Sequence, residues 1–267
     1  MKRFDERSWK VFYSQERKRM ELELDRAIED ALNGTYPQIE RIITKGGALS
    51  FPHTYLKSTM GILSRISASL YRKQPEKVIA FGVIHGMEDY RIENEFSLDN
   101  FEYVFNRTAE LLDVDPIPLE KVYPTDGLVL SDDPSSFIEK LKERGSKLKG
   151  SLDDRTGFVM TGDLAHYGYG YGNHKNGIDP QAHMNQIIER SLEKLYKEKD
   201  YQYFLDYCLR NFNDQIGPGI MVSTILGSPL SYRIFTRELS DYSAILDCKK
   251  PTLVASVFYG VWNDHSG

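Results

Sequence analysis

The stretch "KVIAFGVIHG", residues 77–86, is the clearest sign of the fold in this chain of 267 residues. Apolar side chains fill almost every position and polar residues flank them, which is the pattern of a strand buried on both faces of a parallel sheet. Residues 46–53 and 156–163 ("TGFVMTGD") have the same character, and residues 251–262 are predicted to form the final strand. The chain therefore contains at least four candidate core strands.

Segments with apolar residues at helical spacing separate these strands. Gly34 and Gly145 are expected to end the first and fourth of these helices, and Asp179 followed by Pro180 is a plausible start for the fifth. Alternating strands and helices predict an α/β fold with three layers, α/β/α, around a central mixed, mostly parallel sheet. No long linker divides the chain, so we expect one domain over residues 1–267. The predicted helices cover residues 14–32, 54–71, 96–112, 134–144, 179–199, 201–211 and 217–228.

Composition excludes several classes of function. The net charge is −5 and no basic block appears, so we expect no nucleic-acid partner. The longest apolar runs, such as residues 78–84, are too short to span a bilayer, so we expect no membrane partner. The charged start of the chain, with no apolar segment behind it, predicts no secretory signal. Two cysteines, Cys208 and Cys248, do not make a disulfide framework, which favours a cytoplasmic location.

Candidate metal or catalytic residues follow the predicted strands directly. His53 and His85 end the first two strands, and Asp163 ends the third, with His166 just beyond it. In open α/β sheets, ligands bind beyond the carboxyl ends of the strands. Cys248 precedes the last strand, so it reaches the same edge only if that strand runs antiparallel to the others.

Ordinary structural roles compete with each of these interpretations. A histidine after a strand is more often a hydrogen-bonded loop residue than a ligand, and we assign His174, His183 and His265 to that class. Cys208 has apolar neighbours and is expected in the core. Cys248 lies beside two lysines, which either solvate a turn or favour the thiolate.

The glycines and tyrosines after His166 lack the spacing of a phosphate-binding loop. Three tyrosines of this run either line a pocket or pack against neighbours, and we expect packing for at least two of them: Tyr167, Tyr169 and Tyr171.

The ordered set of motifs resembles the Memo-like family, also called AmmeMemoRadiSam system protein B, whose fold is shared with the class III extradiol (LigB-type) dioxygenases. In this sequence the motifs that carry the resemblance are "FPHTYLKSTMGILSRI", "VIAFGVIHG", "ENEFSLDNF", "TGDLAHYG" and "DCKKPTLVASVFYG".

The resemblance implies a metal bound by two histidines and a cysteine, which fall on His53, His85 and Cys248. The Asp and His of the family's Asp-Leu-Ser-His motif fall on Asp163 and His166, and the related dioxygenases use a histidine in this region as a general acid/base. Those dioxygenases hold iron(II) on two histidines and a glutamate. Further residues that we expect beside the metal or in the pocket wall are Glu95 and Tyr167, and Phe96 stands where the family has a histidine.

The implied cofactor is a divalent metal, with Fe(II) favoured and zinc or copper as alternatives, because such ligands accept all three. The leading hypothesis is an oxidative enzyme related to extradiol dioxygenases that acts on a small chelating or aromatic molecule. One alternative is a non-catalytic metal or redox protein that acts through a protein partner. Another is a zinc hydrolase on the same scaffold.

Overall fold

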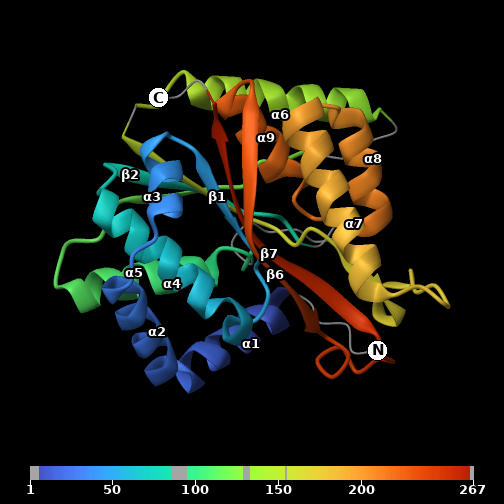
Figure 1. Cartoon of the computed structure of the whole chain (residues 1–267), viewed down its shortest axis with the longest axis horizontal. Coiled ribbons are helices and arrows are strands. Elements are labelled where there is room, and N and C mark those ends of the chain that lie inside the picture. The colour runs from blue at the N-terminus through green and yellow to red at the C-terminus, as the bar shows by residue number, and fades with distance from the viewer. Residues whose placement is uncertain (1–5, 86–94, 129–132, 154, 265–267) are drawn as a thin grey trace.

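A seven-stranded sheet crosses the computed structural model, which describes residues 6–85, 95–128, 133–153 and 155–264 (Figure 1). The main path of hydrogen-bonded strands is β3-β2-β4-β1-β7-β5, and β6 pairs with β7 in addition. The strands are β1 (Ala48–Phe51), β2 (Lys77–Phe81), β3 (Leu119–Val122), β4 (Thr156–Thr161), β5 (His166–Gly168), β6 (Leu230–Asp241) and β7 (Thr252–Asn263).

The sheet is mixed, as predicted. The pairs β1–β4, β2–β4 and β2–β3 are parallel, whereas β7 is antiparallel to β1, β5 and β6. Of the described strands, β7 alone therefore runs against the rest. The last strand thus runs in the direction that Cys248 would need to reach the carboxyl edge of the other strands.

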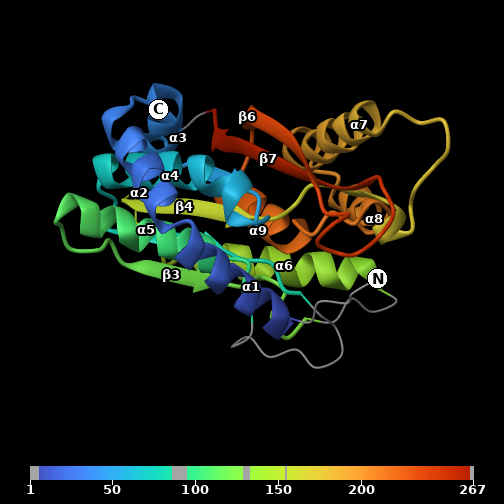
Figure 2. The same ribbon diagram turned by 90° about the horizontal axis from the view of Figure 1, so that it is seen from below.

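Helices cover both faces of the sheet (Figures 1 and 2). Side chains of a strand alternate between faces, so Val78 and Ala80 of β2 join the core under α2 to α5, whereas Ile79 and Phe81 join the core under α6 to α9. This double burial explains the apolar run that marks the fold. The α-helices are α1 (Glu6–Arg19), α2 (Glu21–Asn33), α3 (Pro37–Thr44), α4 (Leu56–Lys73), α5 (Asp99–Leu112), α6 (Pro134–Lys149), α7 (Pro180–Leu192), α8 (Tyr201–Asn211) and α9 (Ile216–Leu226).

The first predicted helix, residues 14–32, is wrong as a single element. The chain turns at Met20 and forms α1 and α2, which diverge from each other (Figure 1). Glu16, near the end of α1, accepts hydrogen bonds from the backbone N–H groups of Leu56 and Lys57 at the start of α4. This contact ties α1 to the beginning of α4, while α2 packs along α4 itself.

Gly145 does not end its helix, contrary to the prediction. A side-chain carbon at Gly145 would lie 3.1 Å from the Met221 carbonyl oxygen of α9. The glycine therefore serves the close approach of α6 to α9, and α6 continues to Lys149.

Several elements were not predicted from the sequence. They are α3, β3, β5 and β6, together with the short 3₁₀ helix η2 (Tyr169–Tyr171). The helix expected over residues 179–199 consists of α7 and the π-helical segment η3 (Glu193–Glu198). None of the helices in the described part of the chain is long and apolar enough to cross a bilayer.

Gly168→Ala is expected to destabilise the protein by more than about 3 kcal/mol. The residue has φ of +121°, and an added Cβ would lie 1.9 Å from the Pro251 carbonyl oxygen, where β5 and β7 meet. Gly172→Ala is the matched control: φ is +72°, but nothing lies within 4 Å of the added carbon, so its cost should be about 1 kcal/mol. Urea denaturation of the two variants measures the difference, and equal midpoints would contradict the expected clash.

Candidate functional site

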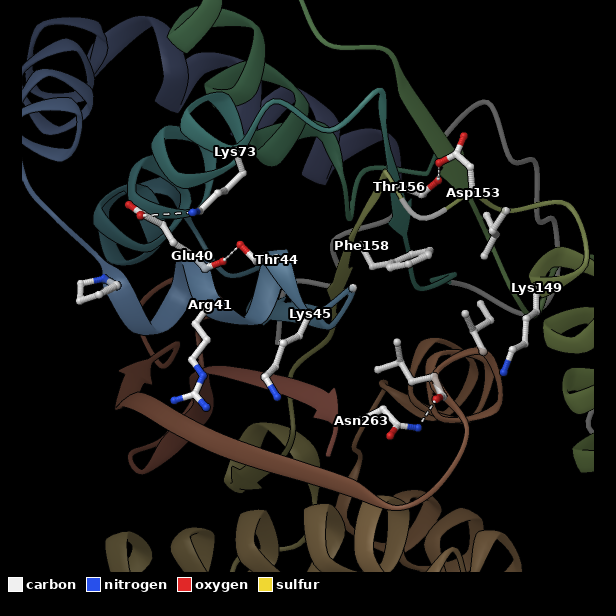
Figure 3. Close-up of a pocket in the computed structure, with 15 residues that line it drawn as sticks. Glu40, Arg41, Thr44, Lys45, Lys73, Lys149, Asp153, Thr156, Phe158 and Asn263 are labelled. Carbon is white, nitrogen blue, oxygen red and sulfur yellow. Dashed lines mark hydrogen bonds and ion pairs between the residues drawn. The ribbon is translucent and has the colours of Figure 1, made fainter. Parts of the chain in front are cut away.

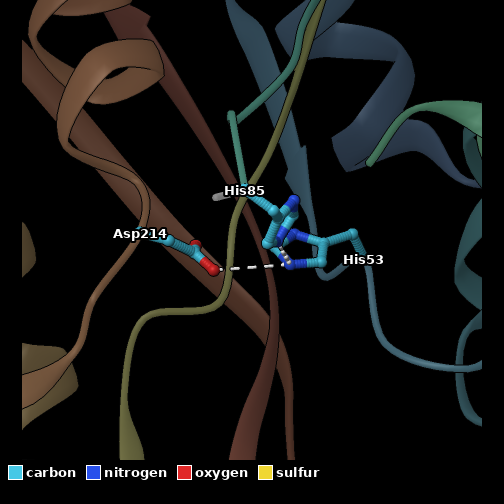
Figure 4. A group of neighbouring side chains, drawn as sticks. All are labelled: His53, His85 and Asp214. Atoms are coloured by element: carbon cyan, nitrogen blue, oxygen red, sulfur yellow. Dashed lines mark hydrogen bonds and ion pairs between the residues drawn. The ribbon is translucent and has the colours of Figure 1, made fainter. Parts of the chain in front are cut away.

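Four segments bring histidine and aspartate side chains together at the carboxyl edge of the parallel strands. β1 leads to His53, β2 leads to His85 and β4 leads to Asp163, while Asp214 comes from the loop between α8 and α9. The rings of His53 and His85 meet nearly at right angles, and Asp214 lies across from His53 (Figure 4). The two Nε2 atoms are 3.0 Å apart, and Asp214 Oδ2 lies 3.3 Å from His53 Nε2.

A second group shares Asp214 with the first. It consists of Asp163, His166 and Asp214, and the candidate ligand atoms of each group lie within 4.8 Å of one another. Asp163 Oδ2 is 3.5 Å from His53 Nε2 and 3.9 Å from His166 Nε2. The structure therefore brings together four of the residues that the sequence predicts, His53, His85, Asp163 and His166.

In His85 and His166, the hydrogen-bond partner of Nδ1 determines which ring nitrogen carries the proton. His85 Nδ1 is 3.0 Å from a carboxylate oxygen of Glu95, and His166 Nδ1 contacts the Phe212 carbonyl oxygen. Because an ionised carboxylate and a carbonyl oxygen only accept hydrogen bonds, both Nδ1 atoms carry the proton. Each Nε2 atom then presents a lone pair to the cluster, which is the form of histidine that binds metals.

Glu95 supports His85 more closely than the sequence could suggest. It is buried, and its carboxylate also accepts hydrogen bonds from the backbone N–H groups of His85, Phe96 and Ser97. Burial opposes ionisation of Glu95, but the contacts with His85 and the backbone donors outweigh it and lower the pKa. The Phe96 ring stacks on His85 with centroids 4.4 Å apart, so it forms one wall of the site.

Ionising both Asp163 and Asp214 is costly without a nearby cation. Burial, and then repulsion by Asp214, raises the pKa of Asp163 well above its usual value, and burial likewise raises the pKa of Asp214. Burial and the neighbouring histidines lower the pKa of His53, which keeps this ring neutral. Within the described residues, neither aspartate forms an ion pair with a lysine or arginine.

These residues fit a divalent metal ion. His53 Nδ1 and Asp163 Oδ1 are buried without hydrogen-bond partners, so the protein alone does not satisfy the cluster. Two nitrogens bound to one ion at about 2.1 Å and at right angles are about 3.0 Å apart, which matches the separation of the two histidine Nε2 atoms. Neutral imidazoles and carboxylates are ligands for divalent metals.

Cys248 belongs to neither group. Its thiol donates to Thr252 Oγ1 at 3.2 Å. Only Tyr259 and the two residues after it pair with β1. The first residues of β7 lie beyond the end of β1 and pair with β5 instead. Cys248 therefore lies outside both groups, and Asp214 is the third side chain beside His53 and His85.

Asp214 was missed because it follows a helix and not a strand. It lies in "NFNDQIGPG", between α8 and α9, where an Asn-Asp pair precedes a glycine-rich helix start. An acidic residue in such a loop is common, and nothing in its spacing from the histidines marks it as a neighbour.

Of the three tyrosines after His166, two pack away from the cluster and one contacts it. Tyr167 points to the opposite face of β5 from His166, is fully buried and bonds through its hydroxyl to the backbone of Lys175. Tyr169 stacks on His174, whereas the Tyr171 ring contacts His166 with centroids 4.8 Å apart. Tyr171 is therefore the tyrosine at the site, and Tyr167, the predicted pocket residue, lies in the core.

A cavity of about 1040 Å³ lies at the other edge of the sheet, away from this cluster (Figure 3). Its lining includes Thr156 at the start of β4 and Asn263 at the end of β7. Its cations Arg41, Lys45, Lys73 and Lys149 lie at the carboxyl ends of α3, α4 and α6. Helix carboxyl ends attract cations, which accounts for these side chains without a ligand.

Glu95→Gln is expected to weaken metal binding about 10- to 100-fold, because the loss of a charged partner of a ligand histidine has costs of this size. Glu102→Gln is the matched control, since Glu102 is partly exposed and pairs with Lys121. Calorimetric titration of metal-free protein with Co²⁺ measures both. Equal affinities for the two variants would show that Glu95 does not support a ligand.

Asp163→Asn is expected to make the metal-free protein less sensitive to alkaline pH. A carboxyl whose pKa is raised on folding contributes full stability below its unfolded pKa, and this contribution is lost as pH rises through the folded pKa. The variant should therefore lose less stability than the wild type as pH rises above about 3.9, the usual pKa of an aspartate. Urea denaturation in chelator measures it. The exposed Asp206→Asn is the control, and parallel pH profiles of wild type and Asp163→Asn would refute the prediction.

No protein-family model matches this chain, and a search of curated proteins finds no match either. The functional interpretation therefore depends on the geometry of the site.

Proposed function

We propose that this protein is a metal-dependent oxidative enzyme of the non-haem iron type, related to the Memo-like proteins and extradiol dioxygenases. The observation that carries the proposal is the arrangement of His53, His85 and Asp214. Two imidazole nitrogens lie 3.0 Å apart, with a carboxylate oxygen 3.3 Å from one of them.

Two histidines and one carboxylate are the ligand set of many non-haem iron(II) oxygenases. The related extradiol dioxygenases hold iron on two histidines and a glutamate. With Asp214 in place of Cys248, the present site is closer to that pattern than the sequence suggested. Bound Fe(II) would supply Lewis acidity and one-electron chemistry toward O₂ and a chelating substrate.

The open side of the cluster favours a small substrate. The side chains of His85 and Asp214 are 28% and 25% exposed, whereas those of His53 and Asp163 are 7% and 4% exposed. A substrate therefore approaches past His85 and Asp214. Aromatic rings border this side, with Phe96 stacked on His85, Tyr171 against His166, and the half-exposed Phe212 near Tyr171. These rings suit an aromatic substrate.

His166 is placed to move a proton. Its Nδ1–H is held by the Phe212 carbonyl oxygen, so Nε2 is free to accept a proton from a substrate hydroxyl. Burial lowers the pKa of His166 to about 4, which keeps this nitrogen unprotonated at neutral pH. Asp163 lies beside it and would stabilise the ring once it becomes charged. The two free cysteines are compatible with a cytoplasmic location for this chemistry.

Protein loaded anaerobically with Fe(II) is expected to bind 4-nitrocatechol with a shift of its absorption spectrum, and to consume O₂ with members of a catechol panel. His85→Ala should reduce both signals at least about 100-fold, because it removes a ligand. His174→Ala, which removes a histidine stacked on Tyr169, should change neither. Failure of iron-loaded wild type in both assays would refute an extradiol-type function.

The same experiment separates the alternatives. Stoichiometric zinc in protein as purified, with hydrolysis of ester or phosphoester probes, would favour a zinc hydrolase. Tight metal binding without turnover of any probe would favour a metal or redox protein that acts through a protein partner.

A further inference from the structure

The two groups of candidate ligands at the carboxyl edge overlap in a single residue. The first group holds His53 and His85 with Asp214, and the second holds Asp163 and His166 with Asp214. One metal ion on the first group uses three of the five side chains. Asp163 and His166 then remain beside it with their own unsatisfied atoms.

Asp163 is the side chain whose surroundings point most directly to a further ligand. The residue is 3% exposed, and its Oδ1 atom has no hydrogen-bond partner. Its Oδ2 atom faces the Nε2 atoms of His53 and His166, at 3.5 and 3.9 Å. His166 Nε2 carries a lone pair, because the proton of that ring is on Nδ1, against the Phe212 carbonyl oxygen. The 3.9 Å between Asp163 Oδ2 and His166 Nε2 is too long for a direct hydrogen bond and leaves both atoms able to contact one ion between them.

Asp214 holds the two groups together. Its Oδ1 atom accepts a hydrogen bond from the Asp163 backbone N–H at 2.6 Å, and the Asp163 carbonyl oxygen accepts one from the Asp214 N–H at 3.3 Å. These bonds fix the two carboxylates next to each other against their mutual repulsion. A buried carboxyl group beside a partly buried one, flanked by the ring nitrogens of two histidines, is an arrangement that cations stabilise.

We propose that the site binds a second divalent cation through Asp163, His166 and Asp214, next to the first, with Asp214 shared between the two. The first ion rests on the proposed function above, whereas the second rests on the geometry of Asp163 and His166. With the second ion bound, His166 is a ligand, so the proton-accepting role proposed above belongs to the form that holds one ion. Paired ions about 3.5–4 Å apart clamp two oxygens of one substrate. The substrate class of this site is therefore a small molecule with two neighbouring anionic or hydroxyl oxygens.

Titration of chelator-treated, metal-free protein with Mn²⁺ tests the proposal without any substrate. We expect about two ions per chain after gel filtration, measured by elemental mass spectrometry, and an electron paramagnetic resonance spectrum of exchange-coupled Mn²⁺. His166→Ala should retain about one ion and show an uncoupled spectrum, because only the second group is lost. His85→Ala should likewise retain about one ion, and Asp214→Asn should weaken both.

His174→Ala is the control and should behave as wild type, and circular dichroism checks that every variant is folded. About one ion in wild type, unchanged in number and spectrum by His166→Ala, would overturn the second cation site and leave the proposed function intact. Binding of no ion by folded wild type would overturn both.

Discussion

The reciprocal hydrogen bonds between Asp163 and Asp214 are the contact on which the site depends. They join the end of β4 to the loop before α9, two segments that are far apart in the chain. Gly162 permits this contact: its φ is +152°, and an added Cβ would lie 2.6 Å from Gln215 Cγ and 3.1 Å from Asp214 Oδ1. A side chain at this position would displace Gln215 and press on the Asp214 carboxylate.

Buried polar bonds below the site hold the same loop against the sheet. Gln215, fully buried next to Asp214, donates to Ser50 Oγ of β1 at 2.6 Å and accepts from the Tyr259 hydroxyl of β7 at 2.5 Å. Satisfied buried networks of this kind fix a single arrangement. The polar groups around Gln215 thus have hydrogen-bond partners, and they support a neighbouring group around Asp163 whose polar atoms do not all have one. In that group two carboxyl groups lie close together with no lysine or arginine partner among the described residues. A protein tolerates such local cost where it serves binding.

The sequence predicts the parts of this structure that follow from local periodicity. The apolar run of β2 and the buried strand β4 indicate a covered sheet, and the residues just after the strands fall at one edge. His53, His85, Asp163 and His166 could be predicted for this reason. Strand β6 could not, since its residues are mostly half-exposed and do not alternate clearly. Asp214 could not either, because its place is set by long-range hydrogen bonds that leave no mark in local sequence.

The exchange of Cys248 for Asp214 at the third position has a chemical consequence. The length of β7 places Cys248 outside the cluster, because the strand pairs with β1 only near Tyr259 and its first residues lie beyond the end of β1. A thiolate is a soft ligand that favours copper(I) and zinc, whereas a carboxylate is hard and suits iron(II) and manganese(II). A carboxylate can also bridge two ions through its oxygens. The register of one strand therefore strengthens the preference for iron(II) over copper and zinc in the proposed site, and the Asp214 carboxylate, common to both groups, could serve more than one ion.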